Sequence, residues 1–281
     1  MLTQPGKKKV PILMYHSISD IANPRFRQFT VSPTLFAEQM AYLRQHAYTP
    51  ITVTQFMRAL FPGETALPDR PVVLTFDDGF ADFFKDALPV LKRYNFTATL
   101  YVSTAFVDGT SRWLQREGEA RHLMLTWEEL AEISMSGIEC GAHSHSHPQL
   151  DTLPCSVARN EILQSKRLLE SHLGREFFSF AYPYGYHTAR VRQLVREAGY
   201  TSACAVRHAM SSVTDDPFSL ARLMVHADTT INKFAALLTG RSSSLATAVY
   251  KIYARARTPG WQLFRRCAAS VTQHLQEGRV A

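Results

Sequence analysis

The most informative part of this chain is an apolar run that ends in two carboxylates and a glycine, Val72-Val73-Leu74-Thr75-Phe76-Asp77-Asp78-Gly79. The β-branched start of this run predicts a buried strand, and Gly79 ends it. Adjacent side chains on a strand point to opposite faces, so Asp77 and Asp78 cannot both be buried within a sheet. At the end of a strand they can turn into one crevice, where open α/β sheets bind ligands. A divalent metal commonly neutralises such a pair. The alternative is a polar turn, for which Asp-Gly is an ordinary signal.

Three histidines within five residues form the second informative feature, His143-Ser144-His145-Ser146-His147, directly after a strand-like segment at 138–142. Neutral imidazole is the commonest side-chain ligand of metals. Histidines four apart meet on one face of a helical turn, and histidines two apart meet on one face of a strand. The spacing therefore leaves two pairs open, His143 with His147 or His143 with His145. Alone, the cluster also fits a solvated loop, but beside two carboxylates it indicates a mixed Asp/His metal site.

These two features and a third segment, Phe180-Ala181-Tyr182-Pro183-Tyr184-Gly185, resemble in order and spacing the motifs of the polysaccharide deacetylases, carbohydrate esterase family 4. The resemblance covers residues 10–235 and implies an α/β fold, a distorted (β/α) barrel of the polysaccharide deacetylase type. It also implies a divalent metal, most often zinc (Zn²⁺), held by Asp78, His143 and His147. By the same resemblance Asp77 is the catalytic base, and the backbone N–H of Tyr184 stabilises the oxyanion.

An early histidine matches a variant of the family pattern. In most members a late Leu-x-His motif supplies the acid histidine. In a circularly permuted group, similar to bacterial poly-N-acetylglucosamine deacetylases, an early Met-Tyr-His element takes its place. Met14-Tyr15-His16 ends an apolar run that predicts the first strand, so the resemblance implies the acid role for His16. His226, which follows another apolar run, is a second candidate. For His16 the alternative is a strand-end histidine that bonds to backbone.

One departure from the family pattern concerns the base. Many members carry an arginine that tethers the base carboxylate, two residues before the proline of the third motif, where this chain has Ala181. Similar permuted members place an arginine where this chain has Arg222, so we expect Arg222 to replace it. A surface arginine is the alternative. Without such a partner Asp77 would have a higher pKa and a poorer orientation.

The order of predicted elements supports the barrel. Strand patterns alternate with helical ones, which is typical of parallel βαβ units. We expect helices over 32–45, 84–94, 126–134, 156–173 and 188–198, and strands over 98–102, 177–181 and 202–206. Active sites of such folds lie at the carboxyl ends of the strands. Residues 105–124 form a long irregular insertion, in which Trp113 faces the substrate or packs as a satellite.

Composition bounds the number of domains and the compartment. The 281 residues suffice for one large α/β barrel or two small domains. No stretch approaches the roughly 20 apolar residues of a membrane span. The apolar run at 10–15 is too short for a signal-peptide core, and four scattered cysteines (Cys140, Cys155, Cys204 and Cys267) indicate reduced thiols. We therefore expect a cytoplasmic enzyme.

The net charge of +7 is concentrated at the end of the chain. Residues 241–281 contain seven Lys/Arg and one acid, Glu277. We expect a catalytic domain over 1–240 and a basic, amphipathic extension over 241–281. Two interpretations of the extension stay open: a helix that lies on anionic lipid at the inner membrane surface, or a helix packed on the barrel. Nucleic-acid binding is not expected, because no nucleic-acid motif accompanies the charge.

Together these features predict a metal-dependent carbohydrate deacetylase that acts on carbon–nitrogen (non-peptide) amide bonds. It would remove N-acetyl groups from a polysaccharide, lipid-linked or nucleotide-linked amino sugar in cell-envelope or exopolysaccharide synthesis. A carbohydrate O-acetyl esterase is the closest alternative, because the same metal, base and acid serve both reactions. A non-catalytic, membrane-associated carbohydrate-binding module is the alternative from another class, and the intact Asp/His set argues against it.

Overall fold

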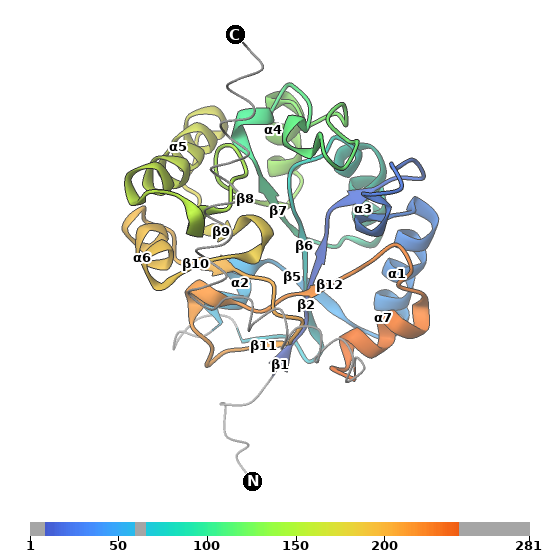
Figure 1. The fold of residues 1–281 in the computed structure, drawn as a ribbon. Helices are drawn as coiled ribbons and strands as arrows, with labels where there is room; N and C mark the ends of the chain where they lie inside the picture. The colour runs from blue at the N-terminus through green and yellow to red at the C-terminus, as the bar shows by residue number, and fades with distance from the viewer. Residues whose placement is uncertain (1–8, 60–65, 242–281) are drawn as a thin grey trace.

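A parallel β-sheet forms the centre of the molecule (Figure 1). The computed structural model describes residues 9–59 and 66–241. The strands of this sheet are β2 (Ile12–Tyr15), β5 (Thr49–Ile51), β6 (Pro71–Phe76), β7 (Thr99–Val102), β8 (Glu139–Ala142), β9 (Ser179–Ala181), β10 (Ser202–Cys204) and β12 (Leu223–Met224). Their order is β10-β9-β8-β7-β6-β2-β12, with β5 paired to the start of β6. All of these pairings are parallel.

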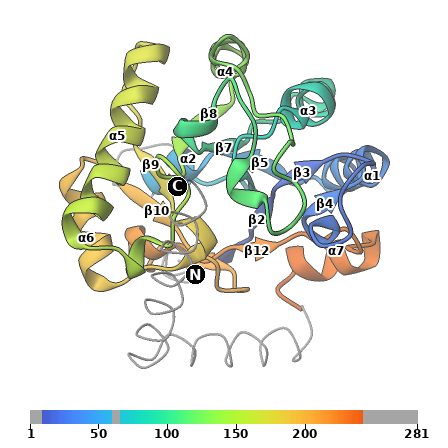
Figure 2. The same ribbon diagram turned by 45° about the horizontal axis from the view of Figure 1, so that its top comes forward.

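Helices surround the curled sheet and give the distorted β/α barrel that the sequence predicts (Figures 1 and 2). The helices are α1 (Pro33–Gln45), α2 (Val53–Arg58), α3 (Leu88–Tyr94), α4 (Trp127–Met135), α5 (Cys155–Leu173), α6 (Ala189–Glu197) and α7 (Ile231–Leu238). Leu220 forms a parallel bridge with Cys204, which links the end of β10 to the segment that enters β12. None of the described helices is long and apolar enough to cross a membrane.

Local sequence signals explain where several helices begin and end. Ser32 caps α1 by accepting a hydrogen bond from the Leu35 N–H, with proline at the first helical position. Thr126 and Glu129 form a capping box at the start of α4. Gly174, in the left-handed region at φ 65°, ends α5. These helices occupy the predicted segments to within one or two residues.

Two predicted elements are interrupted by prolines. Pro11 divides the expected first strand into β1 (Lys9–Val10) and β2, and β1 pairs antiparallel with β11 (Ser211–Ser212). The helix expected over 84–94 begins instead with a π-helical turn, Phe83–Ala87, in which the Leu88 N–H donates to the Phe83 carbonyl. Pro89 has no N–H to continue the ordinary helical ladder, so the regular helix starts beside it.

The predicted strands over 177–181 and 202–206 are shorter than expected, as β9 and β10.

Alternate residues of β6 pack into two different cores. Val72, Leu74 and Phe76 pack in the cluster that the outer helices α1 and α3 share. Val73 packs in a second cluster with Ile12, inside the barrel. Because side chains alternate along a strand, Thr75 and then Asp77 follow Val73 on the interior face. The register of β6 thus directs a carboxylate into the barrel.

The basic extension predicted over 241–281 lies outside the described residues except for its first residue. The expected cytoplasmic location stays a prediction. The described cysteines, Cys140, Cys155 and Cys204, are unpaired.

Candidate active site

The carboxylate pair lies at the carboxyl end of β6. The Asp77 N–H donates to the Tyr15 carbonyl (3.0 Å), which continues the ladder between β6 and β2 by one residue. Asp77 therefore keeps the interior direction of its strand. Asp78 has a φ of 76° and Gly79 one of 88°, so the chain turns sharply here. This left-handed turn lets Asp78 face the same cavity as Asp77, although the two residues are adjacent.

Arg222 holds the Asp77 carboxylate from inside the barrel. Its Nη1 and Nη2 donate to the two oxygens of Asp77, at 2.6 and 2.7 Å. Nη1 also donates to Thr75 Oγ1 (3.1 Å), and Nε donates to the Ala205 carbonyl (3.2 Å). The arginine side chain is fully buried. The guanidinium is thus held by two segments of the barrel, the end of β6 and the residue after β10.

The charge of Arg222 keeps Asp77 ionised. Burial alone would raise the pKa of Asp77, but the groups around the carboxylate, of which Arg222 is the strongest, together outweigh burial and lower the pKa below its ordinary value. Burial alone would lower the pKa of Arg222, and the Asp77 carboxylate raises it instead. The pair is therefore charged at neutral pH. The arginine thus contacts the carboxylate that the sequence hypothesis assigns to it.

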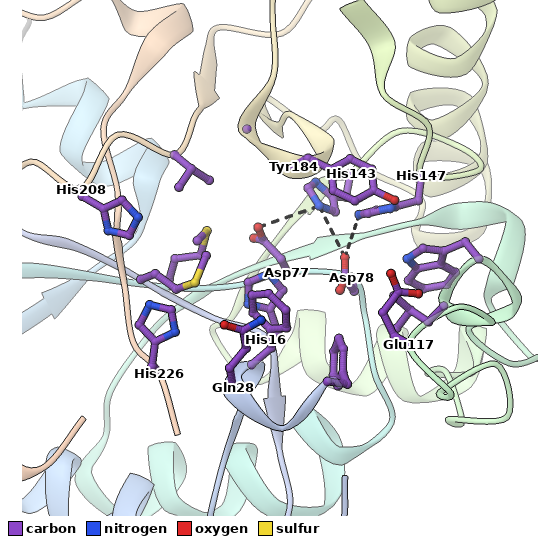
Figure 3. Close-up of a pocket in the computed structure, with 18 residues that line it drawn as sticks. His16, Gln28, Asp77, Asp78, Glu117, His143, His147, Tyr184, His208 and His226 are labelled. Atoms are coloured by element: carbon purple, nitrogen blue, oxygen red, sulfur yellow. Dashed lines mark ion pairs between the residues drawn. The ribbon is translucent and has the colours of Figure 1, made fainter. Parts of the chain in front are cut away.

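Asp78, His143 and His147 form a buried cluster that fits a metal ion. One potential ligand atom from each lies within 4.8 Å of the others. Asp78 Oδ1 lies 3.5 Å from His143 Nε2 and 3.1 Å from His147 Nε2 (Figure 3). This oxygen is buried and accepts no hydrogen bond from the described residues. A buried carboxylate oxygen without a donor is a position that a cation would stabilise.

A backbone contact orients the first histidine. His143 Nδ1 lies 2.8 Å from the Ala181 carbonyl. Because a carbonyl only accepts hydrogen bonds, Nδ1 carries the proton and Nε2 presents its lone pair toward Asp78. Burial lowers the pKa of His143 to about 4, so the ring is neutral at neutral pH. Neutral imidazole with the second nitrogen bonded to a carbonyl is the usual arrangement of a metal-binding histidine.

The histidine segment has neither of the regular conformations that the spacing suggested. Ser144 and His147 have φ values of 62° and 59°, so residues 143–147 form an irregular turn. The Ser144 hydroxyl accepts a hydrogen bond from the His147 N–H (3.1 Å). The turn brings His143 and His147 together, whereas His145 Nδ1 bonds to Thr104 Oγ1 (3.0 Å). Spacing alone could not separate these choices, because the turn is not periodic.

A carboxylate from helix α5 holds this turn. Glu161 Oε2 accepts hydrogen bonds from the His145 N–H (3.0 Å) and the Ser146 N–H (2.7 Å). Glu161 Oε1 accepts from the Ser146 hydroxyl (2.6 Å). Sequence reasoning missed Glu161, which is one of two acids in a long helix and has no motif around it.

Two strand-end histidines reach the cavity from the other side of Asp77. His16 follows Tyr15, the partner of Phe76, and therefore lies beside Asp77. His16 Nδ1 is buried and has no hydrogen-bond partner among the described residues. His226 follows β12, the neighbour of β2, and lines the same cavity at its far end (Figure 3). His16 therefore comes from the strand next to that of Asp77, whereas His226 comes from one strand further away.

The cavity around these groups has a volume of about 390 Å³, within the range of small-molecule sites. Besides the residues above, its walls include Met14, Phe26, Gln28, Phe29, Trp113, Leu114, Glu117, Tyr184, Gly185, Val206, His208 and Met224. The rings of Trp113 and Tyr184 lie 5.1 and 4.8 Å from the ring of His147. Trp113 thus faces the cavity as well as the aromatic cluster behind it.

Tyr184 combines an exposed ring with an unusual backbone. It is 44% exposed and has a φ of 59° in the turn after β9. Its N–H donates to no backbone carbonyl of the described residues.

Glu117, Gln28 and His208 also line the cavity, and sequence reasoning missed them because each lies in a segment without a pattern.

Comparison with known proteins agrees with this geometry. The sequence profile of the polysaccharide deacetylase family matches residues 64–203. YxkH of Bacillus subtilis (strain 168), whose name refers to the same family, is 28% identical over 230 residues, 82% of this chain and 76% of YxkH. Poly-beta-1,6-N-acetyl-D-glucosamine N-deacetylase of Staphylococcus aureus (strain MRSA252) is 22% identical over 217 residues, 74% of this chain and 71% of that protein.

A solved structure gives the same result for the fold. The Streptococcus pyogenes deacetylase PplD, in complex with acetate, has a TM-score of 0.71 at 27% sequence identity, and the match covers 82% of this chain and 98% of PplD. A curled parallel sheet with a catalytic-type cavity at its carboxyl end places the chain among the β/α-barrel hydrolases. The chain belongs to the polysaccharide deacetylase family, carbohydrate esterase family 4. Membership supports hydrolysis of a carbon–nitrogen amide bond, and this family is metal-dependent.

Proposed function

We propose that this protein is a zinc-dependent hydrolase that removes N-acetyl groups from an amino sugar in cell-envelope or exopolysaccharide synthesis. One observation carries the proposal: an unsatisfied Asp78 carboxylate with His143 and His147, beside the Arg222-paired Asp77, in one cavity. Two imidazoles and one carboxylate are ligands that suit Zn²⁺, and three protein ligands leave positions open for water and substrate.

Asp78, His143 and His147 would hold the metal, which when bound would supply a Lewis acid for the attacking water and the acetyl oxygen. Asp77 accepts the proton of the attacking water, since Arg222 keeps the carboxylate ionised and fixes its direction. His16, next to Asp77, protonates the departing amine, which is a poor leaving group until it is protonated. The Tyr184 N–H donates to the oxyanion, a role that its lack of another carbonyl partner supports.

The names of relatives support the substrate class. The Staphylococcus aureus relative is named for N-deacetylation of poly-beta-1,6-N-acetyl-D-glucosamine. Removal of an acetyl group from such a unit yields acetate and a free amine. The cavity volume of about 390 Å³ suits a sugar with its acetamido group rather than a folded protein surface.

Acetate release with metal analysis on the same sample tests the proposal. N-acetylglucosamine oligomers and a lipid-linked N-acetyl sugar serve as substrates, and O-acetylated sugars serve as ester controls. We expect acetate from the N-acetyl substrates that disappears on chelation and returns with zinc. Bound metal with cleavage of esters alone would replace the amide hydrolase by an O-acetyl esterase. Neither metal nor acetate would contradict the proposed mechanism.

A further inference from the structure

Glu117 lines the cavity and has one carboxylate oxygen that is buried without a hydrogen-bond partner among the described residues. It lies in the loop after the 3₁₀ turn Arg112–Leu114, and it lines the cavity together with Asp78, Trp113 and Tyr184. Its Oε2 atom is buried and makes no hydrogen bond to the described residues. Figure 3 shows Glu117 at one end of the cavity and His208 and His226 at the other, with Asp78 between them.

The other acids of this region have partners or belong to the candidate metal site. Asp77 pairs with Arg222, and Asp78 is one of the three residues of that site. Asp82 and Glu119, in the same part of the molecule, both contact His122. Glu117 forms no ion pair with a described lysine, arginine or histidine. Enclosing one oxygen of an ionised carboxylate without a partner is unfavourable, so this group is suited to a ligand that brings a positive charge.

A hydrogen-bond donor accompanies this acceptor. Trp113 Nε1 is also buried, and it donates to no described residue. The ring of Trp113 packs against Phe106, with 4.4 Å between centroids, which holds the indole in place at the cavity wall. An aromatic ring and a carboxylate in one cavity are a favourable setting for an organic cation. A ligand that satisfies both groups carries a cationic donor and an oxygen acceptor.

We propose that Glu117 and Trp113 form a subsite for the ammonium group of a de-N-acetylated amino sugar, next to the unit that reacts at Asp78. This inference rests on the proposed function for its class of ligand, an amino-sugar chain. The proposed reaction converts a neutral acetamide into an amine, which is protonated at neutral pH. A partly deacetylated chain therefore carries ammonium groups beside intact N-acetyl units. Such a chain binds more tightly than a fully acetylated one, so the product of one turnover favours the next on a neighbouring unit.

Binding of oligosaccharides that cannot be deacetylated tests this subsite. The ligands are the trisaccharide of β-1,4-linked glucosamine and cellotriose, which has hydroxyl groups in place of the amines. Their dissociation constants are measured by calorimetry on the zinc-loaded wild type, on Glu117→Gln and on Glu128→Gln. Glu128 is an exposed acid in the first turn of α4 and does not line the cavity, so its variant controls for the loss of one negative charge.

We expect the wild type and Glu128→Gln to bind the glucosamine trisaccharide on the order of tenfold more tightly than cellotriose, the size of one charge-assisted hydrogen bond. Glu117→Gln should lose this preference, keep its affinity for cellotriose and retain its metal. Equal affinities in the wild type, undetectable binding of the glucosamine trisaccharide, equal weakening of both ligands, or metal loss in Glu117→Gln would each overturn the subsite. Because neither ligand carries an acetyl group, the result is independent of acetate release. Failure of the deacetylase proposal would therefore leave this preference measurable.

Discussion

Replacing Arg222 by methionine tests how the base is held. Methionine keeps an extended side chain but removes the charge and the four hydrogen bonds to Asp77, Thr75 and Ala205. Removal of one partner from a buried ion pair typically costs about 3–5 kcal/mol, because the other charge stays buried. Both residues of this pair are almost completely buried, so we expect Arg222→Met to lose about that much free energy of unfolding at neutral pH.

The loss should depend on pH. Burial favours a raised pKa for Asp77, and the surrounding groups, of which Arg222 is the strongest, lower the pKa instead. A carboxyl group with a lowered folded-state pKa stabilises the fold above its unfolded pKa of about 3.9, and this contribution disappears as the pH falls through the folded pKa. In Arg222→Met burial dominates and the pKa of Asp77 rises. The stability gap to the wild type should therefore narrow as the pH falls toward about 4.

Urea unfolding of chelator-treated proteins at neutral and acidic pH measures both effects. The double variant Asp77→Asn/Arg222→Met removes the charge that Arg222 leaves behind, so its loss should fall short of the sum of the single losses by about 1–3 kcal/mol. In the active enzyme the acid limb of the pH–rate profile should move to higher pH in Arg222→Met. A loss within about 1 kcal/mol of zero at neutral pH, an expected size for a surface substitution, would refute the reasoning.

His143→Ala should lose bound metal, since it removes one of the three proposed ligands; full occupancy by elemental analysis after dialysis would contradict the ligand assignment. Asp77→Asn should keep the metal and lose about 10²–10⁴-fold in turnover, and near-normal acetate release would remove Asp77 as base. Glu161→Gln should weaken metal affinity about tenfold, because it loosens the 143–147 turn without removing a ligand. Competition with a chromogenic chelator measures that affinity, with Glu128→Gln as control. An unchanged dissociation constant of the metal in Glu161→Gln would show that the 143–147 turn keeps its conformation without Glu161.

The features that could be predicted from sequence are those with a local signal. The apolar run at 72–76 identified a buried strand, and the acids behind it marked its carboxyl end. Helix caps at Ser32 and Thr126 were equally local. The register across strands has no such signal. Asp77 and Arg222 lie 145 residues apart in the sequence. They meet because the fold brings β6 and β12 to the two sides of the same strand, β2. Only the family resemblance indicated this arginine.

Irregular segments set the second limit. The spacing of the histidines fitted both a helix and a strand, but the turn depends on left-handed residues, Ser144 and His147, and on the distant Glu161. Glu117 had no signal at all, since it is one acid in a loop with no period. Its position became informative only when the structure showed that its oxygen is buried without a partner. Burial without a partner is a property of the packed chain and cannot be read from the order of residues.

The two adjacent carboxylates differ because the chain turns between them. Asp77 keeps the strand direction and lies on the interior face, where Arg222 supplies a positive charge from the protein. Asp78, after a change to a φ of 76°, faces the Nε2 atoms of His143 and His147, which bring no permanent charge of the kind that an arginine brings. One carboxylate is therefore neutralised by the fold, and the other needs a cation from outside. Two groups of the same chemistry can in this way serve as base and as ligand, because their surroundings differ.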